Sequence, residues 1–182
     1  MTSERQTDPL DWPAAIHRAL SEGGVRLVSY VPDAGHKRLI ELCQADEAMK
    51  AVPLTSEEEG IGLAMGAWLA GEKSALLLQS SGVGNLVNVL GALKECRAPA
   101  VMLVTMRGEY GEFNPWQVPM GQATPSVLEK MGVVLERVSE AEKVGPTVEA
   151  AIRLAYRSYT GVAVLISQSL VGIKSFQEQA DR

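Results

Sequence analysis

One run of the sequence, residues 99–105 (PAVMLVT), is apolar at nearly every position. A strand that is covered on one face alternates between apolar and polar residues, whereas an unbroken apolar run is typical of a central parallel strand covered on both faces. Similar runs lie at residues 74–79 (SALLLQ) and 161–167 (GVAVLIS). Because parallel strands are joined by helical crossovers, these runs predict an α/β fold.

The rest of the chain supplies the helices for such a fold. Apolar spacing and Gly/Pro signals predict further strands at residues 26–31, 51–54 and 133–137, and helices at residues 12–21, 36–45, 57–70, 85–95, 123–130 and 140–158. Strands and helices alternate about six times, which predicts a three-layer α/β/α domain with a doubly wound, mostly parallel, six-stranded sheet. We expect a flexible arm at residues 1–11, a single domain at 12–172 and a polar tail at 173–182.

The composition excludes several classes of function. The chain has 182 residues and a net charge of −5, with no basic block, so nucleic acid is not an expected partner. Two cysteines, Cys43 and Cys96, and two histidines show no metal-ligand spacing, so no metal site made by this chain alone is expected. The sequence has no run approaching 18 apolar residues and no secretion-type N-terminus, so we expect a cytoplasmic protein that does not enter the membrane.

Three glutamates, Glu57 to Glu59, stand before a stretch without charge, residues 60–70. A helix that is apolar all round belongs in a core. Ser56 as N-cap with Glu59 as its capping-box partner accounts for one acid, and the helix dipole accounts for Glu57. Neither explanation requires Glu58. On helical spacing Glu58 shares a stripe with apolar or small residues, namely Ile61, Gly62, Met65 and Leu69. If that stripe meets a partner, Glu58 is a carboxylate held against apolar surface and a candidate for proton transfer.

Other unusual residues follow the carboxyl ends of predicted strands, where open α/β sheets bind their ligands. Asp33 and His36 follow the first strand; alternatively, Asp33 caps the next helix and His36 is a surface residue of its first turn. The turn at residues 80–85 (SSGVGN) places Gly82 and Gly84 at a helix start, which suits either close approach of a ligand or a tight turn.

A long stretch at residues 107–121 (RGEYGEFNPWQVPMG) follows the central strand. It carries glycines, prolines and aromatic residues, and long loops of this kind are usually functional. Arg107 stands at the strand end, where it either pairs with an anionic ligand or is an ordinary surface residue.

Two motifs in this order resemble a known family. SEEEGIGLAMGAWLAG followed by LLLQSSGVGNLVNVLGAL resembles the pyrimidine-binding domain of thiamine-diphosphate enzymes. The resemblance spans roughly residues 13–170. It is strongest to the separate α subunits of sulfopyruvate decarboxylase and the matching half of phosphonopyruvate decarboxylase. VPDAGHKRLI and RGE…QVPMGQATPSVLEKMGV resemble two active-site loops of the same family.

The resemblance implies decarboxylation of a small anionic 2-oxo acid with thiamine diphosphate. One glutamate of the family hydrogen-bonds the aminopyrimidine of the cofactor, and counting back from Trp68 assigns this role to Glu58, with a slip by one residue to Glu59 as the alternative. Asp33 and His36 match residues for proton transfer or substrate contact. Gly82, Gly84 and Asn85 match the turn beside the pyrimidine ring; Arg107 is the candidate for the anionic end of the substrate.

One departure from the family pattern concerns the cofactor's phosphates. The family holds the diphosphate and Mg²⁺ through a Gly-Asp-Gly motif and a later Asn, and this chain contains no Gly-Asp-Gly. The resemblance therefore implies half of an active site, completed by a separate β subunit, with self-association also expected. Two other hypotheses stay open: a flavodoxin-like module that binds a nucleotide or phosphate at the SSGVGN turn, and a structural subunit that has lost its chemistry.

Overall fold

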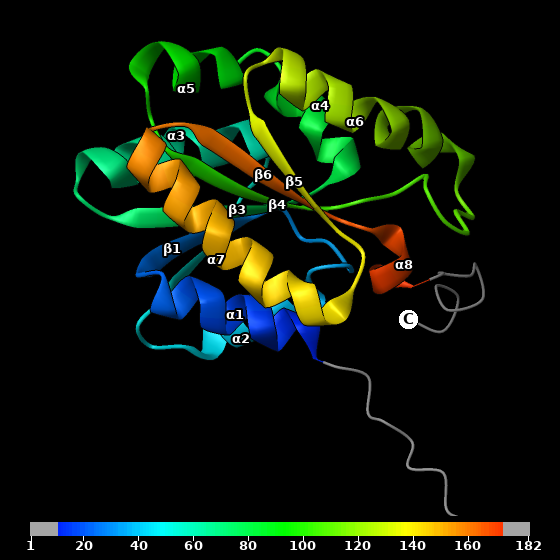
Figure 1. Ribbon diagram of the computed structural model, residues 1–182, viewed down its shortest axis with the longest axis horizontal. Helices are drawn as coiled ribbons and strands as arrows, with labels where there is room; N and C mark the ends of the chain where they lie inside the picture. Colours follow the sequence, from blue (N-terminus) through cyan, green and yellow to red (C-terminus); the bar gives the residue numbers. More distant parts are fainter. Residues whose placement is uncertain (1–10, 173–182) are drawn as a thin grey trace, which may run out of the picture.

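The protein is a six-stranded, all-parallel sheet between two layers of helices (Figure 1). The computed structural model describes residues 11–172; residues 1–10 and 173–182, which hold most of the predicted arm and tail, lie outside the described residues. The strand order is β2-β1-β3-β4-β6-β5. The strands are β1 (Val25–Tyr30), β2 (Lys50–Pro53), β3 (Lys73–Gln79), β4 (Ala100–Thr105), β5 (Val134–Val138) and β6 (Gly161–Ile166). The predicted fold class is confirmed.

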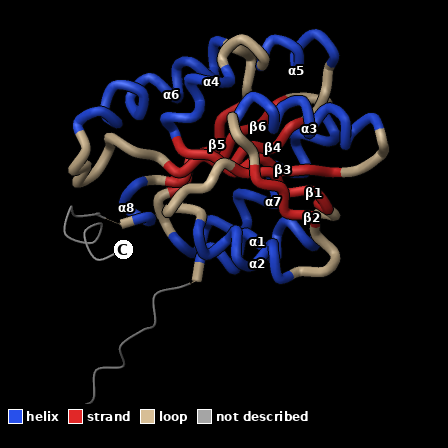
Figure 2. The backbone as a smooth tube through the Cα atoms, turned by 180° about the vertical axis from the view of Figure 1, so that it is seen from behind, coloured by secondary structure: helices blue, strands red, loops and turns tan. Residues whose placement is uncertain are grey.

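The helices divide between the two faces of the sheet, and two opposite views agree on the division (Figures 1 and 2). One face carries α1 (Trp12–Glu22), α2 (Lys37–Ala45) and α7 (Ala141–Ser158). The other carries α3 (Glu57–Leu69), the short η1 (Ser80–Gly82) and α4 (Val83–Leu86), α5 (Leu90–Cys96), η2 (Pro115–Gln117) and α6 (Val118–Lys130). A short α8 (Gln168–Val171) follows β6.

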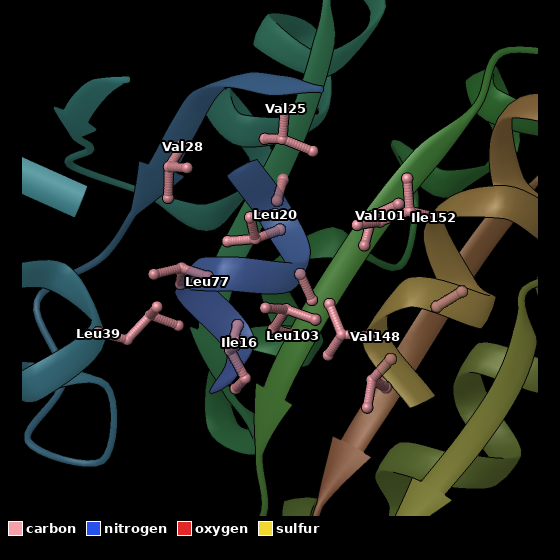
Figure 3. Packing of buried hydrophobic residues seen from close by; sticks show 14 of the residues in the cluster. Ile16, Leu20, Val25, Val28, Leu39, Leu77, Val101, Leu103, Val148 and Ile152 are labelled. Atoms are coloured by element: carbon pink, nitrogen blue, oxygen red, sulfur yellow. The ribbon is translucent and has the colours of Figure 1, made fainter. Parts of the chain in front are cut away.

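The central strands are buried from both sides, as their unbroken apolar runs predict. Every residue of β4 and of β6 is buried. Alternate side chains of these strands enter two separate cores, one on each face of the sheet. Figure 3 shows the core under α1 and α7, where Leu77 and Leu103 from the sheet meet Ile16, Leu20 and Val148 from the helices.

Two predicted helices and one residue of the predicted arm differ from the prediction. The expected helix at residues 85–95 is broken into α4 and α5, which leaves Val87 exposed between them. The helix expected to begin at residue 123 begins at Val118, because Pro119 stands in the first turn, where a missing N–H costs nothing. The irregular part of the long loop therefore ends at Asn114. Asp11, placed in the predicted arm, is the N-cap of α1 and accepts a hydrogen bond from the Ala14 N–H at 3.1 Å.

The chain reverses its winding direction between β1 and β3. The helix after β1 lies on the α1 face, whereas the segments after β3 lie on the α3 face. Neighbouring strands whose connections leave in opposite directions open a crevice at their carboxyl ends, and ligands of open α/β domains bind in such crevices. Residues 33–36 and 80–85 both border this switch point.

Candidate functional site

The first turn of α3 turns one of its three glutamates inward. Glu57 is buried, with 8% of its surface exposed, and it shares the inner face of the helix with Gly60, Ile61 and Ala64. The helix backbone lies directly on the sheet at Gly60, where an added Cβ would come within 2.5 Å of Leu76 Cδ1. This contact fixes the rotation of the helix and thereby selects the residue at position i−3, Glu57, for burial.

The carboxylate of Glu57 meets the turn that follows β3. Asn85 Nδ2 donates a hydrogen bond to Glu57 Oε2 at 2.7 Å. On the other side the carboxylate contacts Gly82, where an added Cβ would overlap Glu57 Oε1. Within residues 11–172, no hydrogen bond reaches Oε1 and no cation pairs with Glu57. Oε1 keeps some exposure to solvent, so one oxygen of a largely buried carboxylate stays available to a ligand.

Glu58, the predicted catalytic acid, faces away from the sheet in the single chain, and its role, which depends on a partner that covers its stripe, stays a prediction. Glu58 is exposed, because the stripe that it shares with Gly62 and Leu69 faces outward rather than toward the sheet. The stripe that contains Glu57, Gly60, Ile61 and Ala64 has the same helical spacing in the sequence, and its small residues are the signal that could have identified it. Glu59, the alternative one residue later, is also exposed in the single chain.

Glu59 caps the helix, although not in the predicted form. Ser56 is the N-cap residue, but its side chain makes no capping hydrogen bond. Glu59 instead reaches back to Thr55, accepting hydrogen bonds from its hydroxyl and from its N–H, the latter at 3.1 Å. These bonds lower the pKa of Glu59. The capping explanation for this acid is therefore correct in kind, with the partner one residue earlier.

Asp33 is fixed at the switch point by side chains from two neighbouring strands. Gln79, at the end of β3, donates to Asp33 Oδ1 at 2.9 Å, and Thr105, at the end of β4, donates to Oδ2 at 2.8 Å. Ser81 in turn donates to Gln79 Oε1 at 2.8 Å. The alternative in which Asp33 caps α2 is wrong, because the N-cap of that helix is His36.

His36 lies fully inside the protein, so the alternative of a surface residue is wrong. Its Nε2 lies 3.2 Å from the carbonyl oxygen of Leu78 and 3.0 Å from that of Leu103, and it must carry the hydrogen because both partners are acceptors. Burial lowers the pKa of His36, which keeps the ring neutral despite the nearby charge of Asp33. The other ring nitrogen, Nδ1, has no hydrogen-bond partner within the described residues, and a role of His36 in proton transfer or substrate contact stays a prediction.

The side chain of Arg107 binds residues of its own loop. Its guanidinium group donates from two nitrogens to Glu112, from Nε at 2.6 Å, and it lies 5.5 Å from the centre of the Phe113 ring. Glu112 also accepts from the backbone N–H groups of Gly108 and Asn114 and from Gln168. Burial works to raise the pKa of Glu112, but these hydrogen bonds outweigh it and lower that pKa to about 2. Substrate binding by Arg107 remains a prediction.

The SSGVGN turn borders the buried carboxylate. Gly82 is buried and faces Glu57, whereas Gly84 is exposed, and an added Cβ on Gly84 would lie 3.5 Å from Met120 Sδ of α6. The structure thus brings Glu57, Gly82, Gly84 and Asn85 together, and the same turn leads back through Ser81 and Gln79 to Asp33. Sequence reasoning did not place Glu57, Gln79 and Thr105 in this cluster. The burial of Glu57 depends on the rotation of α3, whereas the contacts of Gln79 and Thr105 depend on which strand ends are neighbours.

Two structural findings concern the wider chain. Across the described part of the chain, none of the helices combines the length and apolarity that a membrane crossing requires. The same residues contain no group of three or more His, Cys, Asp or Glu side chains placed to hold a metal ion.

The fold and this site define an open α/β domain with a buried carboxylate beside its switch point. Residues 12–124 match the family described as "Thiamine pyrophosphate enzyme, N-terminal TPP binding domain". The chain belongs to this family.

Curated relatives divide into short and long chains. This chain is 35% identical over 161 residues to sulfopyruvate decarboxylase subunit alpha of Methanothermobacter thermautotrophicus, covering 88% of this chain and 98% of the relative. It is 35% identical to a sulfopyruvate decarboxylase of Methanosarcina acetivorans, covering 81% of this chain but 38% of the relative. It is 32% identical to a phosphonopyruvate decarboxylase of Streptomyces viridochromogenes, covering 87% of this chain and 41% of the relative.

A solved structure shows the same fold at low sequence identity. A 2-oxoglutarate:ferredoxin oxidoreductase from Magnetococcus marinus superimposes with a TM-score of 0.70 and 16% identity. The match covers 94% of this chain and 32% of the oxidoreductase chain. This comparison supports the architecture described above.

Proposed function

We propose that this chain is the α subunit of a cytoplasmic, thiamine-diphosphate-dependent decarboxylase of small anionic 2-oxo acids, of the sulfopyruvate or phosphonopyruvate type. Family membership supports the cofactor class, and the names of the relatives support the reaction and the class of substrate. Because the chain covers nearly all of a relative named as an alpha subunit, the proposal is for one subunit of a larger enzyme.

The buried carboxylate of Glu57 is the observation that carries the proposal. One of its oxygens is held by Asn85, and the other has no hydrogen-bond partner within residues 11–172. Oε1 keeps some exposure to solvent, and a ring nitrogen that carries or receives a proton could take the place of solvent there. The site therefore fits an aminopyrimidine group, and we assign to Glu57 the role that the sequence alone gave to Glu58.

Each residue of the cluster then has a distinct part in the reaction. Thiamine diphosphate, when bound, supplies the nucleophilic carbon and accepts the electrons released by decarboxylation. Glu57 would exchange a proton with the aminopyrimidine nitrogen, and Gly82 leaves the room that its carboxylate occupies. Asp33, held by Gln79 and Thr105 at the same switch point, is the second acid available for proton transfer or substrate contact.

The partner subunit would supply the diphosphate site and Mg²⁺, for which this chain has no Gly-Asp-Gly motif. The long relatives fit this arrangement, since more than half of each lies outside the match to this chain. We propose that the partner docks on the outer stripe of α3, defined here as Gly62, Met65, Gly66 and Leu69. Leu69 is 78% exposed, and nothing lies within 4 Å of a Cβ placed on either glycine.

The outer stripe of α3 suits a protein partner rather than solvent. No charged residue occurs between Gly60 and Ala70, although the outer side of this helix is uncovered in the single chain. Glycines on such a surface allow close approach of another helix.

A nucleotide or phosphate site at the SSGVGN turn is disfavoured by the same geometry. The first glycine of the turn faces the Glu57 carboxylate, which would repel a phosphate group. The helix that follows, α4, has four residues, too few for a substantial dipole.

The test is the Glu57→Gln variant in the assembled enzyme, with decarboxylation as the readout. The glutamine keeps the shape and the contact with Asn85 but cannot exchange the proton, so we expect a loss of about 10²–10⁴-fold in kcat. Circular dichroism and thermal unfolding should show an intact fold.

The competing assignment is tested in parallel with Glu58→Gln. We expect this variant to retain most of the activity, because Glu58 lies outside the buried face of α3 that meets Gly82 and Asn85. If the large loss follows Glu58 while Glu57→Gln stays active, the assignment of Glu57 is refuted.

A further inference from the structure

The amide of Asn85 makes the one hydrogen bond that the Glu57 side chain accepts within the described residues. We propose that Asn85 is a positioning residue for Glu57, rather than a ligand of the cofactor as the sequence resemblance implied. The inference rests on the proposed function, but the contact itself is testable without it. In this role, Asn85 would keep the Glu57 carboxyl group in one position while that group is protonated and deprotonated.

The packing around Glu57 leaves Asn85 as its hydrogen-bonding support. Glu57 lies on α3 and Asn85 on α4, and these two helices are in contact. Gly82, on the same turn as Asn85, limits movement of the carboxylate toward η1, since the glutamate side chain already fills the space where a Cβ of residue 82 would lie. The carboxylate is thus confined between a wall at Gly82 and a donor at Asn85.

An asparagine side chain can serve both protonation states of a glutamate. Its NH₂ group donates to an ionised carboxylate, and after rotation of the amide its oxygen accepts from a protonated one. Glu57 can therefore gain and lose a proton without losing its anchor. Leucine at position 85 could hydrogen-bond neither protonation state of Glu57. Aspartate could hydrogen-bond Glu57 only when the two carboxyl groups share one proton.

The contact is tested first on the isolated full-length chain, by thermal unfolding across pH. Asn85→Asp places a second carboxylate against Glu57, so we expect Tm to fall by roughly 2–4 °C at pH 7, a fall limited by the exposure of residue 85 to solvent. The deficit should shrink at pH 4.5, where one proton can be shared. It should also shrink in the double variant Asn85→Asp/Glu57→Gln, because the amide that replaces the Glu57 carboxylate can donate to the new aspartate.

The matched control is Asn88→Asp, three residues further along the same segment. Asn88 is exposed like Asn85, but its side chain makes no hydrogen bond within the described residues, so its conversion should change Tm by less than about 1 °C at either pH. If the Tm deficit of Asn85→Asp is the same at both pH values and is not relieved by Glu57→Gln, the contact with Glu57 is refuted.

The role in catalysis is tested with Asn85→Leu in the assembled enzyme. We expect kcat to fall about 10–100-fold with little change in cofactor affinity. The acid limb of the pH–rate profile should move to higher pH, because the ionised carboxylate has lost its donor.

The remaining outcomes separate this inference from the proposed function. If Asn85→Leu weakens cofactor binding and leaves the pH–rate profile in place, Asn85 is a cofactor ligand and the inference fails while the function stands. If Glu57→Gln leaves turnover intact, the proposed function of Glu57 fails, even where the Tm measurements on the isolated chain confirm the contact.

Discussion

At the scale of single residues, Gly82 occupies a position where the site leaves no room for a side chain. Its φ of −69° is open to any residue, so the backbone does not require glycine there. The requirement is steric, because a Cβ would overlap the Glu57 carboxylate. Gly82→Ala should therefore destabilise the isolated chain by about 1–3 kcal/mol in urea unfolding, as overpacking of a filled site does.

Two variants check the cause of that loss. Gly82→Ala in a Glu57→Ala background should recover most of the stability, since the overlapping group has been removed. Gly66→Ala, in the middle of α3 with open space around it, should instead stabilise the chain by about 0.5–1 kcal/mol. Equal costs of Gly82→Ala with and without the Glu57 side chain would show that the overlap is not its cause.

The difference between Glu57 and Glu58 marks how far residue-level inference from this sequence can reach. Capping and dipole effects explain why acids stand at the start of α3, and both were available from the sequence. Which acid points inward depends on the rotation of the helix, and adjacent residues differ by about 100°. That rotation is set by the contact of Gly60 with Leu76 on β3, which only the assembled fold reveals.

At the scale of elements, the loop after β4 is held by a buried ion pair between Arg107 and Glu112. The side chains are 9% and 4% exposed, respectively. The pKa of Glu112 falls from 4.5 to about 2 in the folded chain, so its pairing stabilises the fold fully above the unfolded pKa. This contribution, about 3 kcal/mol, is lost as pH falls from about 4.5 toward 2.

Acid unfolding of Glu112→Gln tests this element. The variant should be less stable than the wild type at pH 7, by roughly 3–5 kcal/mol, because it leaves Arg107 buried without its partner. The gap between the two proteins should narrow as pH falls below 4.5. A gap that stays constant down to about pH 2.5 would contradict the low pKa of Glu112. Glu109→Gln, at an exposed position of the same loop, is the comparison.

The elements themselves were predictable to different degrees. All six strands were predicted within about two residues, because apolar runs bounded by turn residues leave little choice. The start of α6 was not predicted, since its first turn contains Pro119 and its sequence is typical of a loop. The hydrogen bonds that hold the loop after β4 were also not predictable, because Glu112 and Gln168 are 56 residues apart in the chain and meet only in the folded protein.

At the scale of the whole molecule, the two helical layers differ in what they leave exposed. The α1 layer has a charged outer surface that includes Arg18 and Arg153, whereas the outer stripe of α3 is apolar and contains Leu69. The Glu57 site lies at the first turn of α3. A partner seated on the stripe would thus cover apolar surface and complete the site at once.

This arrangement predicts that assembly and folding can be separated by mutation. Leu69→Asp should change the stability of the isolated chain by no more than about 0.5 kcal/mol, because the leucine is already in solvent. Co-expressed with the diphosphate-binding chain of the same organism, however, the variant should lose assembly in size-exclusion chromatography. Arg18→Asp, an exposed charge reversal on α1, should leave assembly intact. The isolated wild-type chain, given thiamine diphosphate and Mg²⁺, should show no decarboxylation if, as proposed, the partner supplies half of the site. Robust turnover by that chain alone would contradict the two-subunit site, and normal assembly of Leu69→Asp would move the docking surface elsewhere.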